Sequence, residues 1–170
     1  MTLRRALPLA ALALLASSAI AQAQTRLLRQ PTIAGDQIAF AYAGDLWLTT
    51  RAGGAARRLT ATPAVESDPH FSPDGKRLAF TSNRDGIDAV YVMPVEGGEM
   101  KRLTWYPAAS EARGWTPDGR RVMYATNRET APVGHDRLWT VSAEGGPSTV
   151  LPAPFGHRAS YSPDLSLIHI

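Results

Sequence analysis

The sequence predicts an all-β fold, namely a partial β-propeller of about three four-stranded antiparallel blades and the start of a fourth. The first observation is a Ser/Thr-Pro-Asp motif, twice followed by Gly and two basic residues, that recurs at intervals of 44 and 46 residues, beginning at Ser72, Thr116 and Ser162. The second is a Gly-Gly pair with a similar period, at Gly53, Gly97 and Gly145. The third is that each interval holds four short strand-like runs, which is the pattern of a propeller blade.

The chain begins with a segment typical of a secretory signal peptide, residues 1–23. Two arginines precede an apolar stretch at 7–20, and Ala-Gln-Ala at 21–23 fits a small-x-small cleavage site, with cleavage after Ala21 as the alternative. A membrane-spanning helix is the competing interpretation. It is disfavoured, because the stretch contains a proline and two serines and is shorter than the roughly 20 residues that a span needs. We therefore expect an exported, periplasmic protein with no stable membrane span after cleavage.

The first predicted blade covers residues 30–60. Its second strand alternates large and small side chains, with Ile38, Phe40 and Tyr42 separated by alanines. The corresponding strands of the next two blades show the same alternation. Both faces of such a strand suit burial, because bulky side chains on one sheet can pack toward small ones on its neighbour.

The second predicted blade covers residues 67–104, with strands expected at 69–72, 77–82, 89–95 and 99–104. Residues 90–93 of the third strand, Val-Tyr-Val-Met, are an almost unbroken apolar run. Such a run indicates a strand that is covered on both faces.

The third predicted blade covers residues 111–151, and a fourth begins at about residue 157. The loop Thr130 to His135 lengthens the third blade by four residues relative to the second, and it is a candidate for contact with a partner. Propellers usually close with four to eight blades, so we expect the propeller domain at 24–164 to be incomplete. Residues 165–170 break the repeat pattern and resemble the translation of a sequencing-library adapter, and we interpret them as a non-native tail.

The aspartates of the repeated motif are predicted to build turns. In Ser-Pro-Asp-Gly, proline presets φ, aspartate bonds to nearby backbone, and glycine accepts a positive φ. We therefore assign Asp74 and Asp118 to hairpin turns rather than to a metal site or to acid catalysis. Ser72 and Ser162 are likewise assigned to turns rather than to nucleophilic catalysis.

Composition excludes several classes of function. Removal of residues 1–23 leaves 16 Lys and Arg against 15 Asp and Glu, and the basic residues stand singly or in pairs, so we expect no nucleic-acid partner. There is no cysteine, which excludes disulfides and thiolate chemistry.

The sequence contains no hydrolase elbow, zinc-protease helix, phosphate-binding loop or dinucleotide fingerprint. His70, His135 and His157 lie far apart in sequence. They could meet as metal ligands at a channel mouth, but we interpret His70 and His157 as ordinary first-strand residues and place His135 in a loop insertion. We therefore assign no catalytic residue, no cofactor-binding residue and no metal ligand to this chain, and we expect no cofactor.

Three aromatic residues remain as candidates for binding. Trp105 and Tyr106 lie between the second and third blades, and Trp115 opens the third. They could bind a peptide or a glycan, but we favour packing in the core or between blades.

Four segments, together with the repeated hairpin, carry a resemblance to a known family: Arg29-Gln30-Pro31-Thr32-Ile33 before Gly35-Asp36, Gly44-Asp45-Leu46-Trp47, Tyr91-Val92-Met93-Pro94 and Gly114-Trp115-Thr116-Pro117-Asp118-Gly119. From residue 27 to residue 164 the chain resembles the amino-terminal propeller of tricorn-protease-like exported serine peptidases, within the wider group of TolB-like propeller repeats. The resemblance implies that a second propeller, a PDZ-like module and a catalytic region with a serine nucleophile follow in the parent chain. It also implies that the propeller channel guides peptides, while none of the family's catalytic positions maps onto this chain.

The leading hypothesis is therefore a non-catalytic propeller that admits substrate to, or scaffolds, an exported serine peptidase. Its expected partners are a peptide or protein substrate in the channel and the downstream domains of the same parent chain. The alternatives are a TolB-like periplasmic protein-binding module and a propeller fused to another hydrolase, such as an amidohydrolase.

Overall fold

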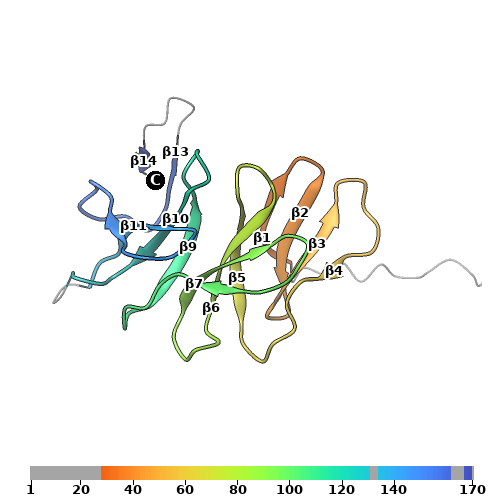
Figure 1. Cartoon of the computed structure of the whole chain (residues 1–170), viewed down its shortest axis with the longest axis horizontal. Coiled ribbons are helices and arrows are strands. Elements are labelled where there is room, and N and C mark those ends of the chain that lie inside the picture. The colour runs from red at the N-terminus through yellow and green to blue at the C-terminus, as the bar shows by residue number, and fades with distance from the viewer. Residues whose placement is uncertain (1–27, 131–133, 162–166, 170) are drawn as a thin grey trace, which may run out of the picture.

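The computed structural model describes residues 28–130, 134–161 and 167–169. Within these residues every element is a β-strand, and the strands form three four-stranded antiparallel sheets and one two-stranded sheet (Figure 1). The predicted class, an all-β partial propeller, is confirmed. No helix in these ranges is long and apolar enough to cross a lipid bilayer.

Each four-stranded sheet is one blade, and its strands pair in chain order. Blade 1 consists of β1 (Arg29–Ala34), β2 (Gln37–Tyr42), β3 (Asp45–Thr50) and β4 (Arg57–Arg58). Blade 2 consists of β5 (Glu66–Phe71), β6 (Arg77–Ser82), β7 (Ala89–Pro94) and β8 (Lys101–Arg102). Blade 3 consists of β9 (Ser110–Trp115), β10 (Arg121–Thr126), β11 (Arg137–Ser142) and β12 (Thr149–Val150). The two-stranded sheet pairs β13 (Ala159–Tyr161) with β14 (Leu167–His169).

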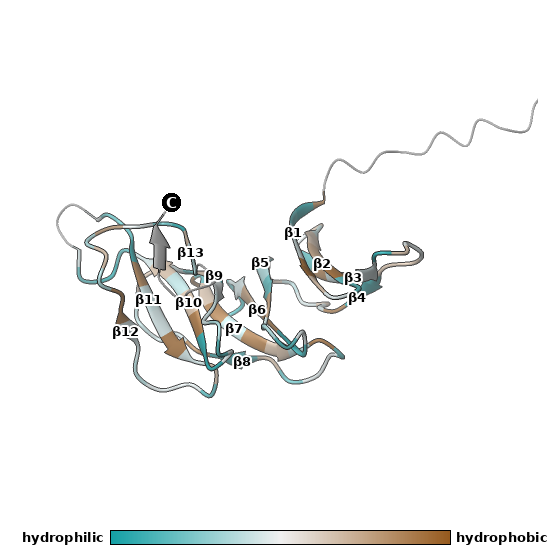
Figure 2. Ribbon diagram, turned by 90° about the horizontal axis from the view of Figure 1, so that it is seen from above, coloured by the Kyte–Doolittle hydropathy of each residue, from teal (hydrophilic) through white to brown (hydrophobic). Residues whose placement is uncertain are grey.

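The first strands of the blades form an inner row. β5 contacts β1 on one side and β9 on the other. Seen from above, the sheets fan out, with the last strands β4, β8 and β12 on the outer side (Figure 2). This arrangement places the strands β1, β5, β9 and β13 toward the centre of the partial ring.

Large side chains of one blade pack on small ones of the next, as the alternation predicts. Phe80 and Tyr91 of blade 2 are buried in one apolar cluster with Ala39 and Ala41 of blade 1. The two rings stack with centroids 5.8 Å apart. Full burial of an aromatic side chain of this size contributes about 2–3 kcal/mol, so these contacts hold the blades together.

Strand β7 is covered on both faces, which confirms the prediction from its apolar run. Tyr91 and Met93 belong to the cluster shared with blade 1. Val90 and Val92 belong to a second cluster, which includes Trp115 and other residues of blade 3. Blade 2 is therefore packed between two neighbours.

Two predicted strand boundaries in blade 2 are wrong. β5 begins at Glu66 rather than at residue 69, because a bulge lets the pairing continue on both sides of the irregular segment. β8 is only two residues long rather than spanning 99–104. The left-handed backbone at Gly97 and Gly98, with φ of 97° and 127°, delays the return of the chain to the sheet.

The turn assignment of Asp74 and Asp118 is confirmed. The hydroxyl of Ser72 donates to Oδ1 of Asp74 at 2.6 Å, and the backbone N–H of Lys76 donates to the same oxygen at 3.1 Å. The corresponding two bonds to Asp118 measure 2.6 and 3.0 Å. Both donors lower the pKa of these carboxyls below 3.8, and the hydroxyl has a larger effect than the backbone amide. The carboxylates therefore serve the hairpins.

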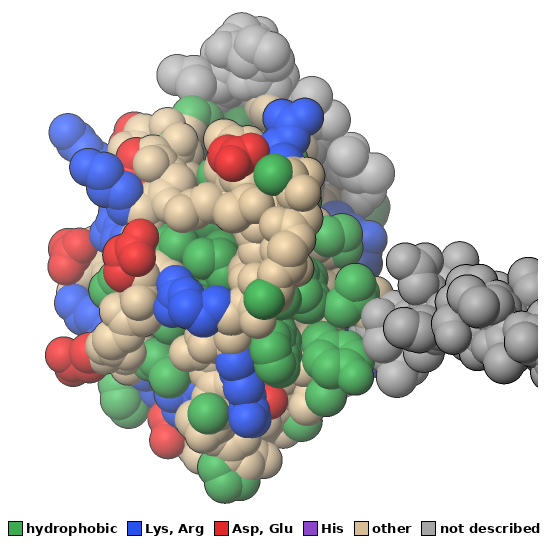
Figure 3. Space-filling model, turned by 90° about the vertical axis from the view of Figure 1, so that its right-hand side faces the viewer, with side chains coloured by type: hydrophobic (Ala, Val, Ile, Leu, Met, Phe, Trp, Pro, Cys, Tyr) green, Lys and Arg blue, Asp and Glu red, His purple; other side chains and the backbone are tan. Residues whose placement is uncertain are grey.

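The free face of blade 1 is apolar. Ile33 is 57% exposed, whereas the corresponding side chains Phe71 and Trp115 are 9% and 8% exposed, because the preceding blade covers them. Figure 3 views the molecule from this end and shows hydrophobic side chains gathered on the surface. Among the described residues, no sheet covers this face.

Both ends of the chain lie partly outside the described residues. The predicted signal peptide, residues 1–23, lies wholly outside them, as do residues 165, 166 and 170 of the predicted non-native tail. Backbone pairing places Leu167–His169 beside Ala159–Tyr161, in register Ala159 with His169. The interpretation of residues 165–170 as a tail stays a prediction.

Candidate functional site

The inner strands share an irregularity that shapes the centre of the molecule. In β1 and β5 the pairing register shifts around Gln30 and Asp68, whose φ values are 52° and 50°. In β9 a shift falls at Arg113. Such bulges redirect side chains and disrupt the exposed strand edge, so the inner edges are poor templates for further strand pairing.

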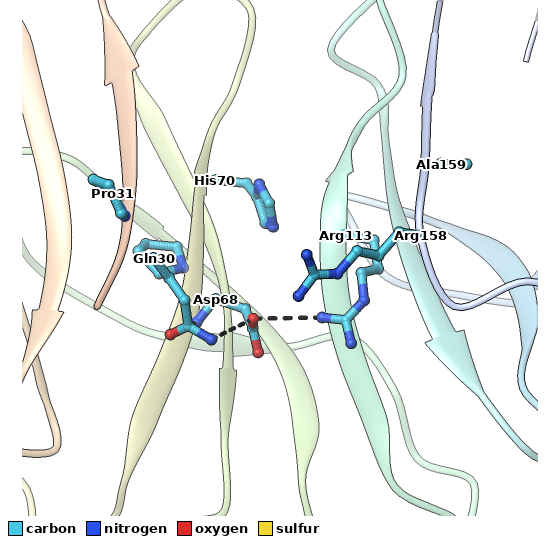
Figure 4. Close-up of a pocket in the computed structure, with 8 residues that line it drawn as sticks. Gln30, Pro31, Asp68, His70, Arg113, Arg158 and Ala159 are labelled. Atoms are coloured by element: carbon cyan, nitrogen blue, oxygen red, sulfur yellow. Dashed lines mark hydrogen bonds and ion pairs between the residues drawn. The ribbon is translucent and has the colours of Figure 1, made fainter. Parts of the chain in front are cut away.

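These irregular segments line one pocket of about 410 Å³ (Figure 4). Its lining residues come from or directly flank the first strands of all four sheets: Gln30, Pro31, Asp68, Pro69, His70, Arg113, Arg158 and Ala159. We call this the inner-strand pocket. Corresponding positions of successive repeats thus meet at one place.

Asp68 is the anionic centre of the inner-strand pocket, and its carboxylate is held from several sides. The side-chain Nε2 of Gln30 donates to Oδ1 at 2.7 Å, and the side-chain Oε1 of Gln30 accepts a hydrogen bond from the backbone N–H of Asp68 at 3.1 Å. The hydroxyls of Ser67 and Thr81 donate to Oδ2 at 3.2 and 3.3 Å. A guanidinium nitrogen of Arg113 lies 3.4 Å from Oδ1. The orientation of Asp68 is therefore fixed before any ligand arrives.

Arg113 joins the third blade to the connection that leads into β13. Its side chain is only 7% exposed and pairs with Glu111. Its Nε donates to the backbone carbonyl of His157 at 2.8 Å, and its Nη2 lies 2.8 Å from Nε2 of the same histidine. Because a guanidinium only donates, Nε2 accepts, and Nδ1–H donates to Asp136 at 2.6 Å. Arg113 is thus fully engaged.

His70 presents a largely buried imidazole to the inner-strand pocket. Burial lowers its pKa below 6.5, against an opposing effect of the charge on Asp68. The imidazole is therefore neutral near pH 7. The indole N–H of Trp115 donates to the backbone carbonyl of His70 at 2.9 Å, which ties β9 to β5 at this level.

The histidine predictions have mixed outcomes. His70 lies within β5, as predicted, but it also lines the inner-strand pocket. His157 lies two residues before β13 and takes part in the Arg113 network. His135 is exposed and does not line this pocket. In the ranges that the structure covers, no three His, Cys, Asp or Glu side chains are grouped so that they could hold a metal ion.

The packing prediction is confirmed for Trp115 and wrong for Trp105. Trp115 is buried in the cluster between blades 2 and 3. Trp105 is 73% exposed, with the guanidinium of Arg102 over its ring at 4.6 Å, and Tyr106 is exposed as well. The loop after β8 therefore carries both rings at the surface. They remain candidates for binding.

The long loop of blade 3 is described only in part, since residues 131–133 lie outside the described ranges. At its start the hydroxyl of Thr130 donates to the backbone carbonyl of Asn127 at 2.6 Å. The contact role predicted for this loop stays a prediction.

Sequence reasoning missed the polar residues of the inner-strand pocket. Corresponding positions of the four repeats are occupied by Gln30, Asp68, Ala112 and Arg158, each of which stands three residues before the large apolar residue that precedes the turn. A structural position would keep one residue type, as the turn aspartate does, whereas this position differs in every repeat. That divergence on the inner strand was the available signal.

Comparison with known proteins agrees with this architecture. The sequence model described as the tricorn protease N-terminal beta propeller domain matches residues 25–170. Tricorn protease homolog 1 of Streptomyces coelicolor is 44% identical over 69 residues, which are 41% of this chain and 6% of the relative. The Tol-Pal system protein TolB of Bordetella pertussis is 35% identical over 48 residues, 28% of this chain and 11% of the relative. The matched segments are thus a small part of these relatives.

Two solved structures share the fold. The crystal structure of the tricorn protease superposes with a TM-score of 0.71 at 24% identity, over 81% of this chain and 14% of that chain. TolB from Acinetobacter baumannii superposes with a TM-score of 0.69 at 23% identity, over 84% of this chain and 38% of that chain. The structures show the shared fold, and the match over residues 25–170 shows that the chain belongs to the family of tricorn protease N-terminal β-propeller domains.

Proposed function

We propose that this chain is a non-catalytic propeller that admits peptides to an exported tricorn-like serine peptidase, with the inner-strand pocket as part of the channel wall. The observation that carries the proposal is the convergence of Gln30, Asp68, His70, Arg113 and Arg158 on one pocket. Family membership supports the link to a peptidase. The catalytic serine would lie in a region of the parent outside this chain.

The chemistry of the pocket suits passage or positioning of a peptide. Asp68 and Arg113 are fixed by hydrogen bonds and ion pairs, so they present stationary polar groups. Neutral His70 and an amide offer hydrogen bonds that a peptide backbone can accept or donate. None of these groups forms a serine, histidine and acid arrangement, which fits a guiding role rather than hydrolysis.

Export is part of the proposal and is supported by the sequence alone. Residues 1–23 have the basic, apolar and small-residue regions of a secretory signal. We propose that the mature chain acts in the periplasm.

The second candidate function is that of a TolB-like protein-binding module. It is favoured by the match to Tol-Pal system protein TolB and by the exposed Trp105 on a connecting loop. Exposed tryptophans are enriched where proteins dock.

The test is to sequence the source genomic locus through and beyond the codon for Asp164. A reading frame that continues into more blades, a second propeller, a PDZ-like module and a serine catalytic region is the expected result. That full-length protein should hydrolyse peptides and be blocked by a serine-directed inhibitor. A frame that ends after ring closure, with no hydrolase region, would contradict the peptidase proposal and favour the binding module.

A further inference from the structure

Arg158 differs from the other charged residues of the inner-strand pocket. It lies just before β13, and its guanidinium points into the pocket beside that of Arg113, toward His70 and Asp68 (Figure 4). Within the described part of the chain, no hydrogen bond or ion pair engages its side chain. Arg113, by contrast, is committed to Asp68, Glu111 and His157.

The charges in and around the pocket distinguish Arg158 from Arg113. Arg113 and Arg158 contribute two positive charges and Asp68 one negative charge, while burial of His70 lowers its pKa and keeps the ring neutral near pH 7. Glu111 pairs with Arg113 and adds a second negative charge, so the group as a whole is balanced, and Arg158 is the cation in it that has no ion-pair partner among the described residues. A doubly charged anion at Arg158 would meet repulsion from the carboxylates of Asp68 and Glu111.

We propose that the inner-strand pocket binds a single carboxylate group of a peptide, with the guanidinium of Arg158 as its principal donor. A guanidinium presents parallel N–H groups that match the two oxygens of a carboxylate. The pocket volume of about 410 Å³ accommodates a carboxylate with part of its peptide. The inference deepens the proposed function and rests on it, because it takes the ligand to be a peptide.

The rigid surroundings favour selection of this group. Asp68 cannot turn to neutralise Arg158 without giving up its bonds to Gln30 and to two hydroxyls. The guanidinium of Arg158 therefore stays available to a ligand. Arg158 itself is exposed and unpaired within the described residues, so its guanidinium is ordered when the carboxylate binds, while Asp68 and Arg113 stay in place.

The test is fluorescence anisotropy of three labelled peptides of equal length titrated with the purified chain. One has no acidic side chain and an amidated C-terminus, the second has the same sequence with a free C-terminus, and the third is amidated with one central glutamate. The proposal predicts that at least one carboxylate-bearing peptide binds about tenfold or more tightly than the neutral one, since a charge-assisted bond is lost. The second and third peptides distinguish a terminal from a side-chain carboxylate.

Arg158→Gln should remove the carboxylate preference, and Arg158→Lys should retain only part of it. Arg51→Gln is the matched control, because Arg51 is exposed after β3 and does not line the inner-strand pocket. Circular dichroism of each variant checks that the β-sheet content is kept.

The outcomes separate the two proposals. A preference that survives in Arg158→Gln, or equal binding of all three peptides to the unaltered chain, would overturn the carboxylate site while leaving peptide admission intact. Absence of binding by every peptide would count against both the site and the channel role.

Discussion

The buried carboxylate of Glu66 tests how blades 1 and 2 are joined. Glu66 is the first residue of β5, its side chain has no exposed surface, and its backbone N–H donates to the carbonyl of Gly44 at 2.8 Å. Its Oε1 accepts the hydroxyls of Thr62 and Ser82 at 2.9 and 3.1 Å and a guanidinium nitrogen of Arg84 at 2.9 Å. Among described residues, Arg84 supplies its one ion pair.

Replacing Arg84 with methionine leaves this carboxylate buried with two hydroxyl donors and no cation. Breaking a buried ion pair by removing one partner costs about 3–5 kcal/mol. Because the Arg84 side chain is 21% exposed and water can reach its place, we expect the lower value of about 2–4 kcal/mol. For a domain of this size the loss lowers the melting temperature by roughly 10 °C.

The assay is urea unfolding followed by tryptophan fluorescence, with the free energy of unfolding extrapolated to water. Arg84→Met with Glu66→Gln should be more stable than Arg84→Met alone, because the unpaired charge is gone. Arg51→Gln is the exposed control and should change the free energy by less than about 0.5 kcal/mol. An Arg84→Met protein as stable as the unaltered chain would refute the reasoning.

Three further predictions concern packing, turns and a buried phenol. Trp115→Ala should lose about 3–5 kcal/mol of stability in urea unfolding, whereas Trp105→Ala should lose less than about 0.5 kcal/mol; equal losses would contradict their placement. Hydroxyl donors lower the pKa of Asp74 and Asp118 below 3.8, so their stabilising contribution is present above pH of about 4 and is lost as the pH falls through the folded values. In the double variant Asp74→Asn, Asp118→Asn, the free energy of unfolding should fall less steeply as the pH is lowered, and an unchanged pH dependence would show the assignment to be wrong. Burial, with a smaller effect from a hydrogen bond to Asp85, raises the pKa of Tyr91 from 10.0 to about 12. The contribution of the neutral phenol to the free energy of unfolding is therefore complete below pH of about 10 and is lost as the pH rises through about 12. Tyr91→Phe should reduce the high-pH step in the ultraviolet tyrosinate titration, and a step of unchanged amplitude would contradict this.

The repeat pattern predicts the blades because each hairpin depends on local chemistry. Proline, aspartate and glycine at fixed offsets build the same turn at Asp74 and at Asp118 wherever they occur. The alternation of Phe80 with alanines predicts inter-blade packing for the same local reason. These features could be found without knowledge of distant contacts.

The inner-strand pocket could not be predicted in the same way. The bulges at Gln30 and Asp68 depend on how the first strand pairs with the second, which composition does not reveal. Arg113 and Arg158 come from different blades, and only the packing of the sheets brings them together. The exposure of Trp105 likewise depends on the path of the loop after β8, which the local sequence does not reveal, so an aromatic residue that suggests a core lies at the surface.

The most direct test of the channel role is site-directed cross-linking from the inner-strand pocket. The chain has no cysteine, so Ala159→Cys in the pocket and Lys76→Cys in the β5–β6 turn each provide a single position for a photoreactive label. Peptide binding in the channel predicts cross-linking from position 159 that an excess of unlabelled peptide suppresses, and little from position 76. Equal cross-linking from both positions, or none from position 159 while the peptide binds, would contradict the assignment of the inner-strand pocket as the peptide channel.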